Sequence, residues 1–241
     1  MPDPLVVVDR LTKSYGRLTA LSEVSFTIRP GEMLGLIGPN GAGKTTLFEC
    51  VAGVLPFEAG EMFLDGRPLT AAARASKTFY MPDAIAPWPS QTVAWAMDFA
   101  AGFFGGSAAA IPGLVDRLQL APLLGSRMGA LSKGQRKRVL LAIGMLTPHP
   151  LLLCDEPFDG LDLRQTREVG AALREHAAAG RTLFLSIHQI SDAARVCDRF
   201  VLLSGGRVRG EGTIAELAAR DPSRPSPASS PSLEDLFLAL T

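Results

Sequence analysis

The pattern of hydrophobic and polar positions predicts strands and helices that alternate along the chain. Apolar runs over residues 33–37, 151–154 and 181–187 have the length of buried strands, whereas residues 21–28 alternate apolar and polar positions as a half-exposed strand does. Shorter runs predict strands over residues 5–9, 60–66, 199–203 and 208–210, with a loop over residues 11–16. Leu47, Val51 and Leu55 recur every four residues, which predicts a helix over residues 44–55.

The middle of the chain has a different pattern. From residue 82 to about residue 130, alanine, glycine and leucine predominate, and helices are predicted over residues 92–104 and 111–120, separated by Gly105-Gly106. Ser132 followed three residues later by Gln135 has the spacing of a capping box, which predicts the start of a helix that ends near residue 146. Further helices are predicted over residues 163–179, 191–196 and 232–240, the last after a Pro- and Ser-rich linker over residues 221–232 that we expect to be mobile.

Composition and charge argue against several classes of protein. Lys plus Arg and Asp plus Glu each number 24, so the 241-residue chain has no net charge to favour nucleic acid or anionic lipid. Residues 1–10 hold two aspartates and no long apolar core, so we expect no signal peptide, and no apolar run reaches the ~18 residues of a membrane span. Cys50, Cys154 and Cys197 have neither disulfide nor metal spacing, and we expect buried thiols in a reducing compartment.

Residues 38–46 read Gly-Pro-Asn-Gly-Ala-Gly-Lys-Thr-Thr and match the phosphate-binding pattern G-x-x-x-x-G-K-[ST]. Glycines let backbone N–H groups surround phosphate oxygens, the lysine reaches the terminal phosphates, and the first threonine hydroxyl can bind Mg²⁺. A predicted buried strand precedes the pattern and a predicted helix follows it, which is the required context. The predicted phosphate-binding residues are Gly38, Pro39, Asn40, Gly41, Ala42, Gly43, Lys44, Thr45 and Thr46, with Thr45 also a metal ligand.

Two acidic residues follow the apolar run over residues 151–154. A parallel strand beside the phosphate-binding loop would place Asp155 near the Mg²⁺, directly or through water. Glu156 points differently and could polarise a water for attack on the γ-phosphate. His188 ends the next predicted strand and could hydrogen-bond the γ-phosphate and that water. We therefore predict Lys44, Glu156 and His188 as catalytic, whereas His149 and His176 have no such context.

Residues 131–135 read Leu-Ser-Lys-Gly-Gln and resemble the signature Leu-Ser-Gly-Gly-Gln of ABC ATPases. Together with the phosphate loop, the acidic pair, residues 159–162 (similar to the D-loop) and His188 (similar to the switch histidine), the motif order resembles that of an ABC transporter ATP-binding subunit. The resemblance implies an α/β fold: a P-loop NTPase core with a mixed or parallel sheet, an N-terminal antiparallel β part and an inserted α-helical subdomain. It implies one ATPase domain over residues 1–220, with the subdomain at about residues 82–146, followed by a linker and short helix over residues 221–241.

The resemblance also implies a mechanism. The cofactors would be ATP and Mg²⁺, and two subunits, identical or different, would enclose two ATP, with the signature of one facing the γ-phosphate bound on Lys44 of the other. Hydrolysis would drive transport through a transmembrane permease on a separate chain, so the subunit would be cytoplasmic and peripheral on the inner face of the cell membrane. The implied nucleotide contacts are Tyr15, which would stack on adenine, and Ser132, Gly134, Gln135 and Asp162.

Two positions depart from the family pattern. Lys133 replaces a signature glycine, which is familiar in exporter-type relatives whose permease is a separate chain. Asp83 stands where the Q-loop glutamine is usual, and its carboxylate could ligate Mg²⁺ or a bound water.

Other interpretations stay open. An ABC ATPase without a transporter would act in DNA repair, translation or cofactor assembly, and such proteins usually carry tandem cassettes, coiled-coil insertions or basic extensions. An accessory subunit that binds ATP without turnover is disfavoured, because the catalytic residue types are all present. The basic run over residues 133–138 coincides with the signature helix, so no nucleic-acid partner is expected. Aromatic residues of the middle segment suit either permease docking or the core, and we expect most of them in the core: Trp88, Trp95, Phe99, Phe103 and Phe104.

Overall fold

Two β-sheets form separate layers in the computed structural model, which describes residues 3–83, 85–220 and 232–240. The first sheet is antiparallel, with order β2-β1-β4-β5 and strands Leu18–Ile28, Val6–Tyr15, Ala59–Leu64 and Arg67–Pro68. The second has order β10-β9-β3-β8-β7-β6 and strands Arg207–Gly212, Arg199–Ser204, Met33–Ile37, Thr182–Ser186, Leu151–Asp155 and Thr78–Met81. Its strands are parallel apart from β10, which pairs antiparallel with β9. The predicted α/β class with an antiparallel N-terminal part is confirmed.

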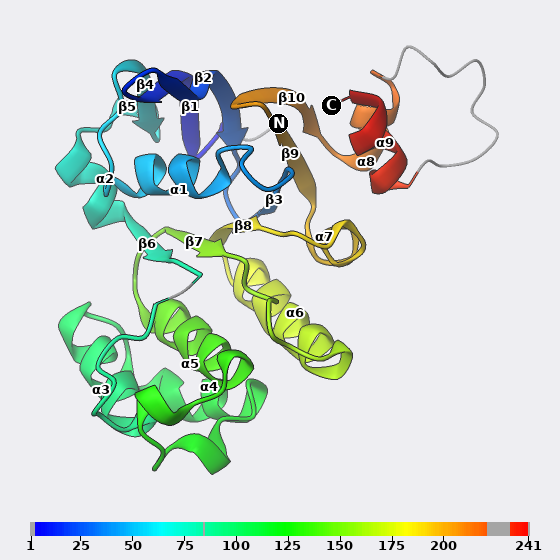
Figure 1. The fold of residues 1–241 in the computed structure, drawn as a ribbon. Helices are drawn as coiled ribbons and strands as arrows, with labels where there is room; N and C mark the ends of the chain where they lie inside the picture. The colour runs from blue at the N-terminus through cyan, green and yellow to red at the C-terminus, as the bar shows by residue number, and fades with distance from the viewer. Residues whose placement is uncertain (1–2, 84, 221–231, 241) are drawn as a thin grey trace.

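Helix α1 (Lys44–Ala52) lies between the two sheets (Figure 1). Its buried face contributes Leu47, Phe48 and Val51 to a core that also includes apolar residues of β1, β2 and β3. Strand β3 is buried at every position, as the central strand of a sheet covered on both faces should be. The phosphate-binding loop between β3 and α1 therefore starts from a firmly held strand.

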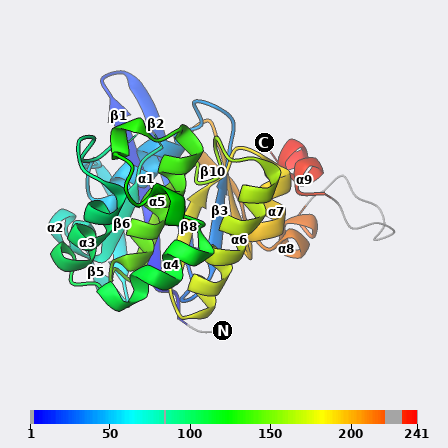
Figure 2. The same ribbon diagram turned by 90° about the horizontal axis from the view of Figure 1, so that it is seen from below.

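Helices cover the opposite face of the six-stranded sheet. Seen from below, α5 (Lys133–Leu146) and α6 (Leu163–Ala178) lie in front of its strands (Figure 2). Helix α3 (Val93–Phe103) packs against α5, and α4 (Ile111–Arg117) packs against both α5 and α6. The remaining α-helices described are α2 (Ala71–Lys77), α7 (Ile190–Val196), α8 (Ile214–Ala218) and α9 (Leu233–Leu240).

The predicted loop over residues 11–16 is wrong, because β1 continues to Tyr15. Arg10 has a left-handed φ of 48°, and the pairing of β1 with β2 changes register between Val8 and Leu11. This bulge moves the buried positions from Val8 to Leu11 and Lys13, so the alternation changes phase by one residue. A strict two-residue period cannot follow such a change.

Three aromatic residues that we expected in the core are instead on the surface. Trp95, Phe99 and Phe103 of α3 are 39%, 36% and 70% exposed. Trp88 and Phe104 are partly buried against the core, as predicted. The strands β5 and β6 and the α-helices α2 and α8 are additional to the predicted elements. Of the predicted linker, residues 221–231 lie outside the described residues, and Ser232 caps α9 through a bond from the N–H of Asp235 to its hydroxyl.

Candidate functional site

The phosphate-binding loop turns sharply from β3 into α1 because glycine occupies its tightest positions. A Cβ atom on Gly38 would lie 2.3 Å from the carbonyl oxygen of Leu203, and Gly43 precedes α1 with a left-handed φ of 102°. Gly43 has no side chain with which to cap α1, which leaves the first N–H groups of the helix to a phosphate. The turn between β9 and β10 supports the loop, since the N–H of Gly206 donates to the carbonyl of Ala42 at 3.1 Å.

Lys44 is buried at the base of this loop, with 8% of its surface exposed. Its Nζ donates to the carbonyl oxygens of Gly38 at 2.7 Å and Pro39 at 3.2 Å. Phosphate oxygens are stronger acceptors than these carbonyls, and the flexible stem of lysine lets Nζ reach them. The carbonyl oxygens of Gly38 and Pro39 thus contact Lys44, whereas residues 40–46 line a cavity beside the loop.

Strand β7 brings Asp155 against the start of α1. The Oγ1 of Thr45 donates to Oδ2 of Asp155 at 3.0 Å, and Asp155 is only 4% exposed. A hydroxyl and a carboxylate are ligands that Mg²⁺ prefers, so this pair fits an ion that is also bound to phosphates. Among the described residues, no group of three or more His, Cys, Asp or Glu could hold a metal.

Ser186, at the end of β8, joins the two acidic residues. It is completely buried, its hydroxyl donates to Oδ1 of Asp155, and it accepts the N–H of Glu156 at 3.0 Å. Glu156 has a left-handed φ of 53°, which is uncommon for a residue other than glycine. The Ser186 hydroxyl therefore supports the acidic pair in a backbone conformation that few residues adopt unaided.

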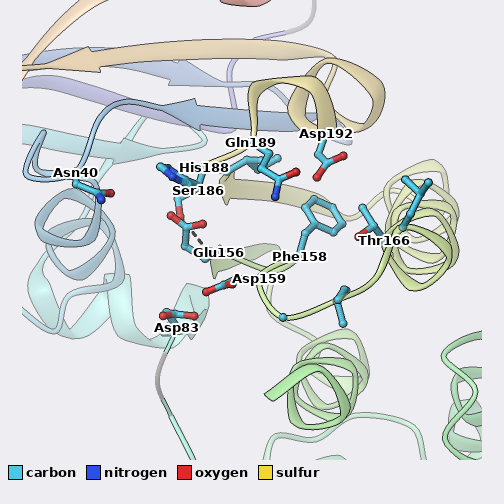
Figure 3. Close-up of a pocket in the computed structure, with 14 residues that line it drawn as sticks. Asn40, Asp83, Glu156, Phe158, Asp159, Thr166, Ser186, His188, Gln189 and Asp192 are labelled. Atoms are coloured by element: carbon cyan, nitrogen blue, oxygen red, sulfur yellow. Dashed lines mark hydrogen bonds between the residues drawn. The ribbon is translucent and has the colours of Figure 1, made fainter. Parts of the chain in front are cut away.

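Glu156 lines a cavity together with Asn40, His188, Asp159 and Asp83. Figure 3 shows Glu156 between His188 on one side and Asp159 and Asp83 on the other. Burial raises the pKa of Glu156, although the charges of Lys44 and His188 oppose the shift. A carboxylate with a raised pKa is a better proton acceptor, as a general base requires.

A second cavity, of about 610 Å³, adjoins the first and contains the wall of the phosphate loop. Tyr15, at the end of β1, lies on this wall with Leu18, Thr19 and Ala20. Tyr15 is 46% exposed and Leu18 is 67% exposed, so both present apolar surface to the cavity. A flat base can stack on an aromatic ring in such a place.

The signature residues lie outside both cavities. Oε1 of Gln135 accepts the N–H of Ser132 at 2.9 Å, and Oγ of Ser132 accepts the N–H of Gln135 at 3.3 Å, which confirms the predicted capping box. A Cβ atom on Gly134 would lie 2.5 Å from the carbonyl oxygen of Gly160, so glycine permits α5 to approach the D-loop. In a single chain, the signature residues therefore do not line the cavity that the phosphate-binding loop borders.

The D-loop borders the site with its first three residues, Asp159, Gly160 and Leu161. Asp159 lines the cavity of Glu156, whereas Asp162 caps α6 by accepting the N–H of Gln165 at 2.8 Å. Asp162 lines neither cavity described in the chain. Its role in one subunit is therefore to begin α6.

Asp83 lines both cavities and is paired with lysines of α5. Its Oδ1 lies 2.8 Å from Nζ of Lys137 and 3.9 Å from Nζ of Lys133. Lys133 also donates a hydrogen bond to Asp159, and this contact lowers the pKa of the Asp159 carboxyl. The residue in the Q-loop position thus already has a cation beside it.

The basic run over residues 133–138 is partly internal. Lys137 is 2% exposed and Arg138 is 9% exposed. Arg138 donates to the carbonyl oxygens of Leu118 at 3.0 Å and Gln119 at 3.3 Å. Both cations are therefore buried and donate to main-chain oxygens of the protein itself.

Similarity to known proteins identifies the family of this chain. The ABC transporter family model matches residues 21–159. The chain belongs to the ABC transporter ATP-binding family. Nod factor export ATP-binding protein I of Paraburkholderia xenovorans is 33% identical to this ABC subunit over 227 residues, covering 92% of this chain and 75% of that protein. ABC-type transporter ATP-binding protein EcsA of Bacillus subtilis is 30% identical over 243 residues, covering 98% of this chain and 96% of that protein.

Solved structures agree with the assignment to the ABC family. An ATP-binding subunit of an ABC transporter has a TM-score of 0.87 and 30% identity, and the match covers 98% of this chain and 99% of that one. A bacterial Atm1-family ABC exporter with ATP bound shares the fold, with a TM-score of 0.79 and 24% identity over 91% of this chain and 40% of that one. Proteins of this family are ATPases, and ATP is the nucleotide of this subunit. Among the described residues, no helix has the length and hydrophobicity to cross a membrane.

Sequence reasoning missed several residues that the fold brings to the site. Ser186 and Lys137 contact the acidic pair, and Leu18 lies beside Tyr15. Gly205 and Gly206, in the turn between β9 and β10, also line the cavity beside the phosphate-binding loop. The one available signal is the position of Ser186 two residues before His188, which places it at the end of the same strand.

Proposed function

We propose that this ABC ATPase hydrolyses ATP at a site shared between two ATP-binding subunits, and that closure of the site drives a partner permease. The observation that carries the proposal is how the motifs are divided. Lys44, Thr45 and Asp155 share one cavity, whereas Ser132 and Gly134 lie outside it. A second subunit would bring its Ser132 and the N-terminus of its α5 against the γ-phosphate, where an anion is favoured. Gln135 and Asp162 would hold the helix starts at that interface.

Within one half of the site, each residue has a chemical task. Tyr15 stacks on adenine, while Lys44 and the N–H groups of the loop bind the phosphates. Thr45 and Asp155 would hold Mg²⁺, which would supply positive charge beside the transferred phosphoryl group. Glu156 takes the proton of the attacking water, and His188 hydrogen-bonds the γ-phosphate.

Helix α3 offers a surface for the permease. Trp95, Phe99 and Phe103 follow one another every four residues, and their rings stack with centroid distances of 4.9 and 5.4 Å. An exposed row of aromatic rings is typical of a protein contact. Docking there would hold the subunit on the cytoplasmic face of the cell membrane. We further propose that residues 1–220 act as one ATPase domain whose helical subdomain, residues 82–146, receives the permease, with residues 221–241 as an extension.

Export is the direction of transport that the similarities favour. A relative whose name includes Nod factor export is 33% identical, and Lys133 occupies the signature position discussed above. The transported substrate contacts the permease, so its chemistry is set by that partner.

The shared site is tested with Glu156→Gln, which keeps the side-chain shape but removes the base. With Mg²⁺ and ATP, the variant should elute from gel filtration as a dimer, and its turnover should fall by about 100-fold or more. Lys44→Ala is the matched control and should stay monomeric, because it cannot hold the phosphates. A wild type that turns over ATP, combined with a Glu156→Gln variant that stays monomeric, would reject the shared site.

The proposed association with a permease is tested by affinity purification of the tagged wild-type subunit from detergent-solubilised membranes. A multi-spanning membrane protein should co-purify, and the double substitution Phe99→Ser/Phe103→Ser should reduce its recovery. Recovery of soluble partners alone would favour an ABC ATPase without a transporter.

A further inference from the structure

Lys137 places a buried ammonium beside the catalytic strand. The residue lies in α5, and only 2% of its side chain is exposed. Its Nζ donates to the main-chain oxygen of Asp155 at 2.8 Å and lies 2.8 Å from Oδ1 of Asp83. One ammonium group therefore joins the end of β6 to the strand that carries Asp155 and Glu156.

A buried ammonium requires a counterion, because removal of its hydration is costly. The carboxylate of Asp155 is engaged elsewhere, since Oδ1 accepts from Ser186 and Oδ2 accepts from Thr45. In the part of the chain that the structure describes, Asp83 supplies the carboxylate within 4.0 Å of Nζ. Asp83 is therefore the counterion of Lys137.

We propose that Lys137 is a positioning residue for ATP hydrolysis, and that Asp83 acts through this ion pair instead of as a Mg²⁺ ligand. The inference rests on the proposed hydrolysis at this site. Asp83 comes two residues after β6 ends at Met81, where the chain leaves the sheet for the segment that contains α3. Movement of that segment would displace Asp83 and, through Lys137, the peptide between Asp155 and Glu156.

Lys133 provides a contrast on the same helix. It lies four residues before Lys137, and its Nζ is 3.9 Å from Oδ1 of Asp83. However, its side chain is 48% exposed and is hydrogen-bonded to Asp159. Water screens exposed ion pairs, so loss of Lys133 should affect Asp83 much less than loss of Lys137.

The test is a double-mutant cycle with Asp83→Asn and Lys137→Met. Each single substitution should lower kcat about tenfold, and the double variant should be no slower than the slower single variant, since one substitution already breaks the pair. The Mg²⁺ concentration for half-maximal turnover should change less than about twofold in every variant. Lys137→Arg, which keeps the cation, should recover most of the turnover of Lys137→Met.

Two further substitutions serve as controls. Lys77→Met removes an exposed lysine directly before β6 and should leave turnover unchanged. Lys133→Met should combine nearly multiplicatively with Asp83→Asn, because water screens the longer, exposed contact between these two groups. For variants that fold poorly, the same double-mutant cycle is measured on the free energy of unfolding in urea. There Asp83→Asn should destabilise more than Lys137→Met, because it leaves the buried ammonium alone.

Effects that multiply in the Asp83→Asn/Lys137→Met variant would overturn the proposal. So would an Asp83→Asn variant that needs about tenfold more Mg²⁺ while Lys137→Met does not, because Asp83 would then be a metal ligand. A wild type without ATP turnover would reject the proposed function together with the positioning role. Turnover with multiplicative effects would reject the role of Lys137 alone.

Discussion

Ser186 and Asp155 lie opposite each other in the parallel pairing of β8 with β7, and the buried hydroxyl of Ser186 donates to Oδ1 of Asp155. The same hydroxyl accepts the N–H of Glu156. One side chain therefore supports both the residue that we assign to Mg²⁺ and the residue that we assign to the attacking water. Loss of the Ser186 hydroxyl should therefore impair both the binding of Mg²⁺ and the attack by water.

Ser186→Ala tests this dual support. We expect kcat to fall by about 10- to 100-fold and the Mg²⁺ concentration for half-maximal turnover to rise severalfold, because two preorganised hydrogen bonds are lost. Steady-state ATPase measurements over a Mg²⁺ titration supply both values. Ser191→Ala, at an exposed position of α7, is the control and should behave as the wild type. An unchanged Mg²⁺ dependence would show that Ser186 does not support Asp155.

The bounds of elements that a local sequence pattern marks are predicted almost correctly. Strand β3 has the bounds Met33–Ile37 that its apolar run predicts, and α5 begins at Lys133 directly after the predicted cap. The strand β6 is not predicted, because its four residues are defined by pairing with β7, far away in the sequence. The bulge at Arg10 likewise hides the second half of β1.

The candidate site follows the same division. Lys44 and Asp155 belong to contiguous motifs, and the fold brings them to one cavity. A serine that ends an apolar strand carries no such pattern, and the role of Ser186 depends on the register of β7 with β8. Lys137 looks like one member of a basic surface run until its burial is known. Both residues act through contacts between segments, which a single-sequence pattern does not encode.

Gly134 is expected to tolerate no side chain. A Cβ atom there would lie 2.5 Å from the carbonyl oxygen of Gly160, so Gly134→Ala must push the D-loop away from α5. We expect a loss of about 1–3 kcal/mol in the free energy of unfolding and reduced turnover. Gly113→Ala, in α4 with open space around it, is the control and should be neutral or stabilising by up to ~1 kcal/mol. Urea unfolding of both variants provides the measurement. Equal free energies of unfolding for Gly134→Ala and Gly113→Ala would contradict the close packing of Gly134 against the D-loop.

Arg199 is the centre of a buried ion-pair network. Its side chain is 6% exposed and contacts Glu32 at 3.0 Å and Glu211 of β10. Arg199→Met should lower the free energy of unfolding by about 3–5 kcal/mol, because two carboxylates would be left without their cation. The double variant Arg199→Met/Glu32→Gln should recover part of this loss. A change below about 1 kcal/mol in urea unfolding of the single variant would show that the network contributes little.

His176 should make the protein acid-sensitive. Burial in α6, aided by the charges of Arg181 and Arg117, lowers the pKa of His176 from 6.5 to about 4. Well above pH 6.5 the imidazole is neutral in both the folded and the unfolded chain, so it has no effect on stability there. As the pH falls from 6.5 towards 4, the unfolded chain binds a proton that the folded chain does not, and stability decreases.

By pH 5 this group alone should lower the free energy of unfolding by about 1–2 kcal/mol relative to pH 7.5. His176→Gln removes the titrating group and should reduce the stability difference between the two pH values by that amount. Urea unfolding at both pH values provides the measurement. If His176→Gln and the wild type lose equal stability on acidification, the histidine is protonated in the folded chain and burial does not depress its pKa.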